Sequence, residues 1–258
     1  MNKEQSVTLL RINKRKQVAV LAGLGFSATN DMRASLFPSY IRWSGGLLDL
    51  TVACIRISDG QRFYFTATEW QALDNQTKAN LGKIGIRVRA MQQSFIIAPE
   101  SIGAKEYGGN LNVTAVTDWS ETGANNPFWS EENALTVTQT INTAYGTTTR
   151  NNIVGAPAAR EALAYHSLRQ SVDGIDDGCD WCLPLVRHAY VMFRYKTEIN
   201  ALFRLAWSSS NELTNVTHWC CQEASTNNAW AVNFSAGQVN VPTKITAYNV
   251  RAITLLDT

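Results

Sequence analysis

The pattern of apolar side chains changes its period in the second half of the chain, and this change constrains the fold more than any other feature. From Leu183-Pro184 to Phe203 the apolar residues recur at helical spacing, which predicts a long amphipathic helix. Proline is tolerated in the first turn of a helix, so this pair marks the helix start. From Ala206 onward, short runs separated by polar turns predict strands. Helices followed by several short strands indicate an α+β domain.

The alternation typical of a strand is clearest between residues 230 and 235. Trp230, Val232 and Phe234 would lie on one face of an extended strand, and we expect that face to be buried. Gly237 then permits a tight turn. The intervening side chains should face outward, together with polar residues further along the chain. This outward set is Ala231, Asn233, Ser235, Gln238, Asn240, Thr243, Thr246, Tyr248 and Asn249.

Amide, hydroxyl and phenol side chains dominate this outward set, and such side chains adapt their hydrogen bonding to many partners. We therefore treat the set as a candidate ligand-binding face. The alternative is an ordinary solvated sheet edge. The candidate face also includes Asn211, Thr226, Asn227 and Asn228.

Residues 48–98 predict a smaller α+β or β-rich unit. Asp59-Gly60 is well placed for a tight type I′ turn in a hairpin over residues 48–67. The segment Thr68–Gln71 fits a capping box at the start of a helix, and Gly82 would close that helix. Two further strands are expected at residues 84–90 and 94–98.

Residues 99–130 are interrupted by glycine and proline, whereas a helical pattern returns at residues 156–170. This contrast predicts a soft domain boundary near residues 125–135. The expected organisation is a basic N-terminal arm at residues 1–17, an attachment or assembly domain at 18–130 and a binding domain at 131–258.

Charge and composition argue against several classes of function. The chain has 258 residues, with 23 Lys and Arg against 21 Asp and Glu, and this balance disfavours nucleic acid as the main partner. The basic residues among residues 1–17 are most simply a solvated arm. The polarity comes mainly from 24 Thr, 21 Asn and 17 Ser, which suits an exterior in contact with proteins or sugars. The sequence shows neither a signal-peptide pattern nor an apolar stretch of membrane-helix length, so we expect a cytoplasmically made protein without membrane insertion.

Four short motifs occur in a recognisable order in the C-terminal half. They are Asp180–Pro184, Trp207–Glu212, Asn228–Val239 and Val250–Ile253, with Lys244 before the last. In these motifs the chain resembles the C-type-lectin-fold domains of the Lcl C-terminal type, found in bacteria and phages. It also resembles the variable proteins of diversity-generating retroelements. The resemblance covers about residues 145–255 and implies two helices on a twisted antiparallel sheet.

The resemblance implies that large apolar anchors pin the two helices onto the sheet, while the outward positions are those that vary in retroelement-diversified relatives. Two features depart from the family pattern. His188 and Ala189 stand where an acidic residue usually follows the Leu-Pro pair, and residues 213–226 form a longer stretch than usual. The second departure bears on the transfer of ligand contacts. The structural set is Trp181, Leu183, Pro184, Trp207, Trp230, Val232, Phe234, Gly237 and Arg251.

The cysteines leave alternatives open, although we expect no metal site and no cofactor. Cys179, Cys182, His218, Cys220 and Cys221 could together bind zinc, but buried free thiols are the simpler interpretation. A disulfide from Cys179 or Cys182 to the Cys220-Cys221 pair would suit an exported protein. Formylglycine-generating oxidases share the broad fold, but fold kinship is not evidence of chemistry, and we expect no catalytic residues.

These features together favour a non-enzymatic binding or display protein. The expected setting is a phage virion, where the chain would be a fibre, receptor-binding or capsid-decorating component. Its partners would be other virion proteins and a host surface protein or glycan, with homo-oligomers, such as trimers, that add up weak contacts. The alternatives are a bacterial protein that uses the same domain to bind a protein, and an enzyme of the formylglycine-generating type.

Overall fold

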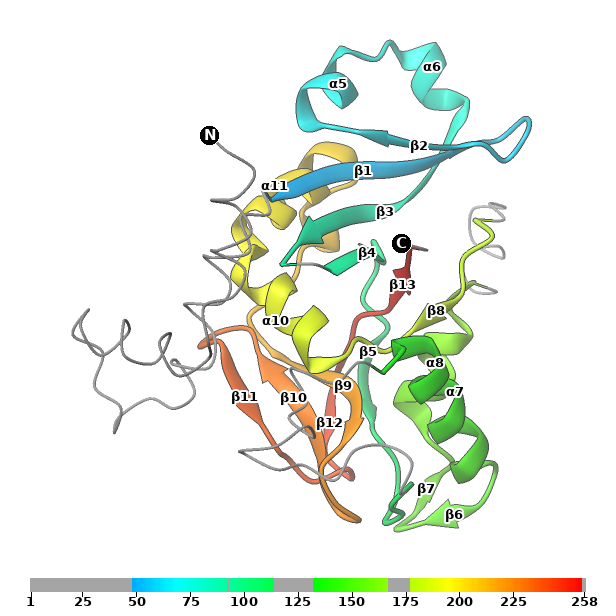
Figure 1. The fold of residues 1–258 in the computed structure, drawn as a ribbon, viewed down its shortest axis with the longest axis vertical. Coiled ribbons are helices and arrows are strands. Elements are labelled where there is room, and N and C mark those ends of the chain that lie inside the picture. The colour runs from blue at the N-terminus through cyan, green and yellow to red at the C-terminus, as the bar shows by residue number, and fades with distance from the viewer. Residues whose placement is uncertain (1–47, 92, 114–131, 167–176, 257–258) are drawn as a thin grey trace, which may run out of the picture. The chain divides into compact units, whose positions relative to one another are not determined.

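The computed structural model describes residues 48–91, 93–113, 132–166 and 177–256, drawn in colour in Figure 1. These residues belong to one compact unit, Leu47–Thr258. The expected basic arm and the start of the expected attachment domain lie outside the described residues. Helices combine with largely antiparallel sheets, which confirms the α+β class.

The larger sheet joins strands from both halves of the chain. Its strand order is β2-β1-β3-β4-β13-β8, and all neighbours pair antiparallel. Val52, Ile86, Ile97 and Ile253 are paired in turn across four strands and are fully buried, so this row forms the centre of the sheet's core. The strands are β1 Asp49–Arg56, β2 Arg62–Phe65, β3 Leu81–Ala90, β4 Gln93–Ile97, β8 Trp181–Cys182 and β13 Ile253–Leu255.

The smaller sheet has the order β11-β10-β9-β12-β5. Its neighbours pair antiparallel except β12 and β9, which are parallel. A separate two-stranded hairpin is formed by β6 and β7. The strands are β5 Gly103–Glu106, β6 Thr149–Arg150, β7 Ile153–Val154, β9 Thr217–Glu223, β10 Ala229–Asn233, β11 Gln238–Asn240 and β12 Ala247–Val250.

The expected boundary near residue 130 does not divide the described structure. Strand β4 pairs with β13 in the larger sheet, and β5 pairs with β12 in the smaller one. Each pair joins a segment before residue 130 to a segment near the C-terminus. Hydrogen-bonded ladders therefore cross the proposed boundary in both sheets, which explains why residues 47–258 form one compact unit.

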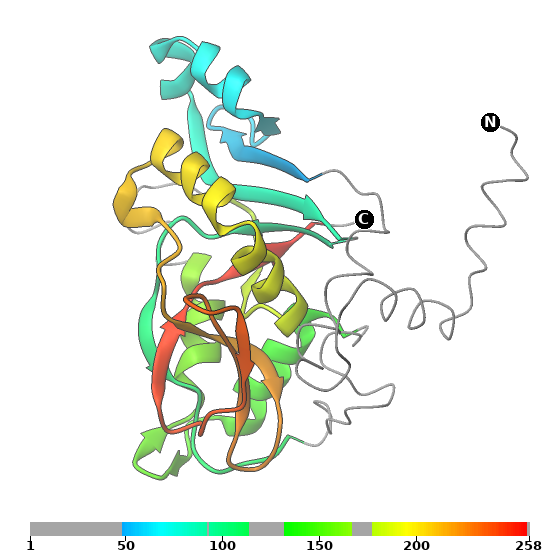
Figure 2. The ribbon, with the colours of Figure 1, turned by 90° about the vertical axis from the view of Figure 1, so that its left-hand side faces the viewer.

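The long amphipathic stretch after Leu183-Pro184 forms two helices, α10 Val186–Arg194 and α11 Lys196–Ala206, separated at Tyr195. Tyr195 has φ −110° and ψ 24°, outside the helical region, so the helix axis changes there. Helix α10 contacts β9 and β10, whereas α11 contacts β1 and β3. The break therefore lets one apolar stripe cover both sheets (Figures 1 and 2).

The region between β1 and β3 differs in detail from the prediction. Five residues, 57–61, connect β1 to β2, so the connection is longer than a two-residue turn, although Gly60 has the positive φ of 72° that a turn favours. The capping box begins at Thr66, not Thr68: the Thr66 hydroxyl accepts a hydrogen bond from the Glu69 amide, and the Glu69 carboxylate accepts one from the Thr66 amide. Gly82 lies within β3.

Four more helices complete the described elements. Two short helices follow β2, and α7 and α8 lie beside β8 (Figure 1). Pro157 occupies the first turn of α8, as its rigid φ favours, and this helix ends at Leu163. The sequence pattern did not predict α7 or β5. The helices are α5 Ala67–Ala72, α6 Asn75–Ala79, α7 Ala134–Tyr145 and α8 Pro157–Leu163, and a 3-10 turn covers Ser209–Asn211.

Most residues of the expected structural set are buried, but Trp207 is not a core anchor. Its half-exposed ring packs edge-on against Phe203 at a centroid distance of 5.7 Å, and the Lys83 ammonium lies 5.1 Å from its centroid. Trp207 therefore covers the end of α11 instead of filling the core. The buried members are Trp181, Leu183, Pro184, Trp230, Val232, Phe234 and Arg251.

Arg251 is a buried cross-link between three distant segments. Its guanidinium donates hydrogen bonds to the carbonyls of Ala98 and Pro99, at 3.0 and 2.7 Å, and to those of Asn211 and Glu212, at 3.2 and 2.9 Å. Burial lowers the pKa of Arg251 to about 10, so the side chain remains a cation at neutral pH. Arg251 thus joins the end of β4 and the turn after α11 to the C-terminal strands.

Gly237 allows a close approach between the β10–β11 turn and α10. It has φ of 68°, and a Cβ atom there would lie 2.3 Å from Cε1 of Phe193. We expect Gly237→Ala to lower the free energy of unfolding by about 2–3 kcal/mol, because strain in φ adds to a steric clash. Urea unfolding followed by circular dichroism measures this loss.

Gly60→Ala is a matched control for this substitution. Gly60 has a similar φ, but a Cβ atom there would meet nothing within 4 Å. We expect a cost of about 1 kcal/mol from φ strain alone. Equal losses in the two variants would contradict the proposed contact with Phe193.

Candidate functional site

Five residues of the predicted ligand face come together at one end of the smaller sheet. The loop at residues 224–228 joins β9 to β10, and the segment at residues 241–246 joins β11 to β12. Asn228 and Thr243 form an antiparallel bridge, and the Lys244 amide donates to the Asn227 carbonyl at 2.9 Å. We name these two segments the polar loop surface. The predicted residues within it are Thr226, Asn227, Asn228, Thr243 and Thr246.

Local hydrogen bonds hold the polar loop surface in one conformation. The Ser225 hydroxyl accepts hydrogen bonds from the amides of Asn227 and Asn228, at 3.3 and 3.1 Å. The Asn228 side-chain amide donates to the Val241 carbonyl at 2.8 Å, which ties the two segments together. The side chains of Thr226, Asn227 and Thr243 remain exposed. The surface therefore combines a fixed backbone with exposed hydrogen-bonding groups.

A second part of the predicted face lies at the opposite end of β10. Asn233 is half-buried, and its side-chain oxygen accepts hydrogen bonds from the amide and hydroxyl of Ser235, at 2.8 and 2.7 Å. Gln238 pairs with Asn233 in the ladder and is exposed, whereas Asn240 is half-buried two residues further along β11. Asn233, Ser235 and Gln238 are separated from the polar loop surface by the length of β10, whereas Asn240 directly precedes Val241 at the start of that surface.

The remaining predicted residues do not extend the face. Ala231 is fully buried, so the expectation that it faces outward is wrong: its neighbours Trp230 and Val232, on the opposite face of the strand, are buried as well, so both faces of β10 are covered. The half-buried Asn211 donates to the Pro99 carbonyl at 3.0 Å and helps to hold that loop. Tyr248 packs edge-on against Trp219 at 5.1 Å, and Asn249 is half-buried beside β9.

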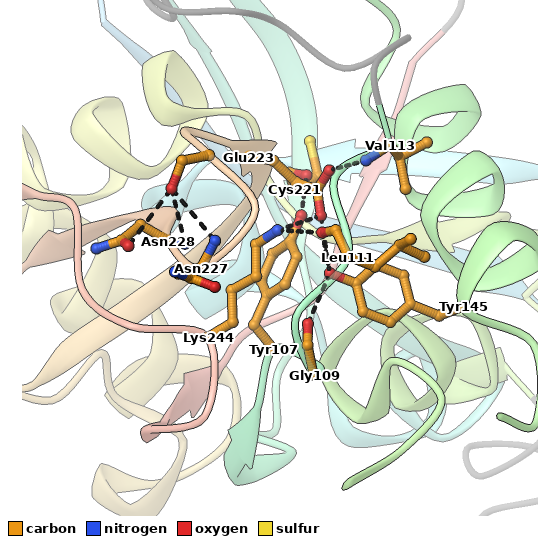
Figure 3. A network of polar contacts seen from close by, with 11 residues as sticks. Tyr107, Gly109, Leu111, Val113, Tyr145, Cys221, Glu223, Asn227, Asn228 and Lys244 are labelled. Atoms are coloured by element: carbon orange, nitrogen blue, oxygen red, sulfur yellow. Dashed lines mark hydrogen bonds and ion pairs between the residues drawn. The ribbon is translucent and has the colours of Figure 1, made fainter. Parts of the chain in front are cut away.

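A buried ion pair supports the polar loop surface from beneath (Figure 3). The Lys244 ammonium lies 2.6 Å from the Glu223 carboxylate, and both side chains are fully buried. Lys244 also donates to the Leu111 carbonyl at 2.6 Å. Glu223 accepts further hydrogen bonds from the Tyr145 hydroxyl, at 2.9 Å, and from the Val113 amide, at 2.7 Å. Both charges are therefore well compensated, as buried ions require.

Two tyrosines enclose this ion pair. The ring centroids of Tyr107 and Tyr145 lie 5.7 and 5.9 Å from the Lys244 ammonium, within the range of cation–π attraction. Burial lowers the pKa of Lys244, while the charge of Glu223 opposes that shift. Burial, reinforced by the nearby Glu223 charge, raises the pKa of Tyr145, so this phenol remains a donor to the carboxylate. The network joins β9 and α7 to the segment that follows β5.

Sequence reasoning placed Lys244 in a motif but missed its partner. Lys244 is the only charged residue between Glu223 and Arg251. This isolation does not by itself identify a buried partner, because a lysine in a polar turn is normally exposed. Because Lys244 is buried, the polar loop surface itself carries no exposed charge.

The cysteines, for which zinc binding and a disulfide were alternatives to buried free thiols, lie in the core. All five cysteines are free and buried. Burial raises the pKa of Cys54 to about 12, and raises those of Cys182, Cys220 and Cys221 as well. Among the described residues, no three His, Cys, Asp or Glu side chains are placed to hold a metal ion.

These thiols should be unreactive in the folded protein. A thiol reacts as its thiolate, and burial both raises the pKa and blocks the reagent. We expect less than one equivalent of Ellman's reagent to react with the native chain within minutes at pH 8, and all five thiols to react in 6 M guanidinium chloride. Rapid labelling of two or more native thiols would contradict the buried positions.

Comparisons with known proteins add little to this geometry. No protein-family model matches the chain, and no curated protein matches it. Among solved structures the chain is similar to a fimbrial protein from Bacteroides ovatus ATCC 8483, with 13% identity and a TM-score of 0.45. The match covers 78% of this chain and 40% of the fimbrial protein, so the chain spans less than half of that protein's length. None of the helices in the described ranges has both the length and the apolar composition of a membrane-spanning segment.

Proposed function

We propose that this protein is a non-enzymatic binding protein that presents the polar loop surface to a macromolecular partner. The observation that carries the proposal is that the exposed side chains of this surface differ from the groups that hold its loops in place. Exposed side chains of Thr226, Asn227 and Thr243 offer hydrogen bonds. The buried Lys244–Glu223 pair and the Ser225 and Asn228 side chains hold the loops in place, and the Thr243 hydroxyl also lies 2.9 Å from that of Thr246. The exposed side chains can change without loss of the fold, which suits a surface that adapts to partners.

We further propose that the C-terminal part follows the C-type-lectin arrangement suggested by its motifs. Helices α10 and α11 follow the Leu-Pro pair, and α10 packs on the sheet that carries the polar loop surface. The buried positions of Trp181 and Arg251 agree with the anchoring roles that the motif resemblance implies. The similarity of the sequence motifs, and not a comparison of structures, supports this finer assignment.

The setting we propose is a phage virion, in which the chain is a fibre, receptor-binding or decorating component and assembles as a homo-oligomer. Exposed amides and hydroxyls make weak single contacts, so display in many copies would supply the avidity. The partners would be other virion proteins and a host surface protein or glycan. A bacterial protein that uses the same surface to bind another protein is the alternative.

The first test is mass spectrometry of intact phage particles from a culture whose phage encodes this chain, together with light scattering of the purified protein. The proposal expects the chain in particles and an oligomer in solution. A monomer that is absent from particles and binds no cells would overturn it. Recovery from the bacterial envelope instead of particles would favour the bacterial alternative.

The second test addresses the surface itself. In a cell-binding assay with the labelled full chain, the double variant Asn227→Ala/Thr243→Ala should bind at least about tenfold more weakly, because each lost hydrogen bond costs about 1 kcal/mol and avidity multiplies the loss. Gln71→Ala, an exposed change on α5, is the control and should bind normally. Equal binding by both variants would place the contact elsewhere.

A further inference from the structure

A cavity lies apart from the polar loop surface, between α7, α8 and the loop that leads into β8. Its volume is about 540 Å³, within the range of small-molecule sites, about 300–1,000 Å³. Figure 1 shows α7, α8 and β8 side by side, and their mutual contacts agree. The described residues that line the cavity are Leu135, Gln139, Leu163, His166, Gly178, Cys179, Asp180 and Trp181.

One wall of this cavity is fixed by a buried carboxylate. Asp177 is fully buried and accepts hydrogen bonds from the Trp181 indole at 3.0 Å and from the Cys179 amide at 2.9 Å. Its carboxylate also lies 2.9 Å from Nδ1 of His166, within hydrogen-bonding distance. The Arg62 guanidinium holds the same loop through the carbonyls of Asp177 and Gly178, at 3.2 and 2.9 Å. The polar groups of this wall are therefore preorganised, which lowers the cost of binding.

The lining favours a neutral ligand over an ion. Among the described lining residues none is lysine or arginine, which disfavours an anion. Asp180 is the one carboxylate among them, and the carboxylate of Asp177 is already occupied by three hydrogen-bonding partners, which disfavours a strong cation site. Burial raises the pKa of Cys179 to about 12, so its thiol stays protonated and is unsuited to covalent attack.

The remaining chemistry is an amide, an imidazole and a carboxylate together with two leucines, of which Leu135 lies one helical turn from Gln139 on α7. Gln139, His166 and Asp180 offer planar donors and acceptors, and Leu135 and Leu163 offer half-buried apolar surface. A pyranose ring carries hydroxyl groups around its edge and an apolar C–H face, and so matches both the polar and the apolar groups of the lining. We propose that this cavity binds a neutral saccharide of one or two rings.

The test is saturation-transfer NMR on the full chain with glucose, galactose, N-acetylglucosamine, rhamnose, lactose and maltose. The proposal expects saturation transfer to at least one of them. Gln139→Leu removes the exposed amide with little change of volume and should weaken binding about tenfold, as the loss of about one well-placed hydrogen bond does. Leu163→Trp, which fills the cavity, should abolish binding.

The control and the contrary outcomes separate this site from the polar loop surface. Asn227→Ala/Thr243→Ala should leave saccharide binding unchanged, because those residues are not among the lining residues. Three results would overturn the proposal. They are loss of saccharide binding in Asn227→Ala/Thr243→Ala, saccharide binding by Gln139→Leu equal to that of the parent, and no saturation transfer to any of the six sugars. Preferential binding of a primary amine such as lysine methyl ester would also overturn it. If Asn227→Ala/Thr243→Ala weakens cell binding but not saccharide binding, that result supports the proposed function of the polar loop surface and leaves the cavity proposal unchanged.

Discussion

Replacement of Lys244 by methionine should lower the free energy of unfolding by about 3–5 kcal/mol, the range measured when one partner of a buried ion pair is removed. Methionine fills a similar volume, so little cavity forms. The cost arises because the Glu223 carboxylate stays buried without its cation and the Leu111 carbonyl loses its donor. Guanidinium unfolding at pH 7, followed by tryptophan fluorescence, measures the loss.

A double-mutant cycle distinguishes the ion pair from general packing. Glu223→Gln combined with Lys244→Met removes both charges, so the double variant should be more stable than the sum of the single losses predicts, by about 1–3 kcal/mol. Lys105→Met changes a half-exposed lysine of β5 and should fall within about 0.5 kcal/mol of the parent. A loss below 1 kcal/mol for Lys244→Met would show that the ammonium is not buried as the structure places it.

The Lys244–Glu223 network also shows why the sequence predicted residues of the polar loop surface but not the buried ion pair beneath them. Alternation over residues 230–234 correctly predicts that Val232 and Phe234 are buried, because period-two patterning is a local property. The pairing of Glu223 with Lys244 depends instead on how the β11–β12 segment returns to the end of β9. That return is a tertiary feature, and a single sequence contains no local signal for it.

Errors in the prediction have similar physical causes. Periodicity followed the apolar stripe through Tyr195 because a break between two helices in phase does not interrupt the spacing of buried residues. The capping box was displaced by two residues because Thr66 and Thr68 are both good N-cap residues, and each is followed three residues later by a suitable partner, Glu69 or Gln71. Ala231 was placed outward because alternation assumes one solvated face, whereas β10 is covered on both.

Stability should fall steeply in mild acid, because two histidines are buried in their neutral form. Burial lowers the pKa of His188 and of His218 to about 3, from an ordinary value of 6.5. Nδ1 of His188 accepts a hydrogen bond from the Leu185 amide, and the His218 ring packs 4.2 Å from that of Phe234 with no partner at Nε2. Protonation of either ring would place a positive charge in the core, and protonation of His188 at Nδ1 would also remove the acceptor of the Leu185 amide.

The sign of the pH dependence follows from these lowered values. As the pH falls below 6.5, the unfolded chain binds protons at both histidines before the folded chain does, so stability that is fully present above pH 6.5 is lost toward pH 3. Each ring should contribute about 2 kcal/mol of loss between pH 6.5 and pH 5. Urea unfolding at intervals from pH 7.5 to pH 5 measures the slope.

Substitution of His218 provides the sharpest check of this acid sensitivity. Phenylalanine can replace the ring against Phe234 and leaves no polar atom unpaired in place of Nε2, so His218→Phe should keep the fold at pH 7.5 and roughly halve the loss of stability between pH 6.5 and pH 5. His188→Asn retains an acceptor for the Leu185 amide, and it should remove the other half of the loss of stability between pH 6.5 and pH 5. NMR titration of the imidazole carbons gives an independent measurement. If either ring of the folded protein titrates near pH 6.5, that ring is solvated, and the packing of α10 or of β9 against its neighbours must differ from the arrangement described above.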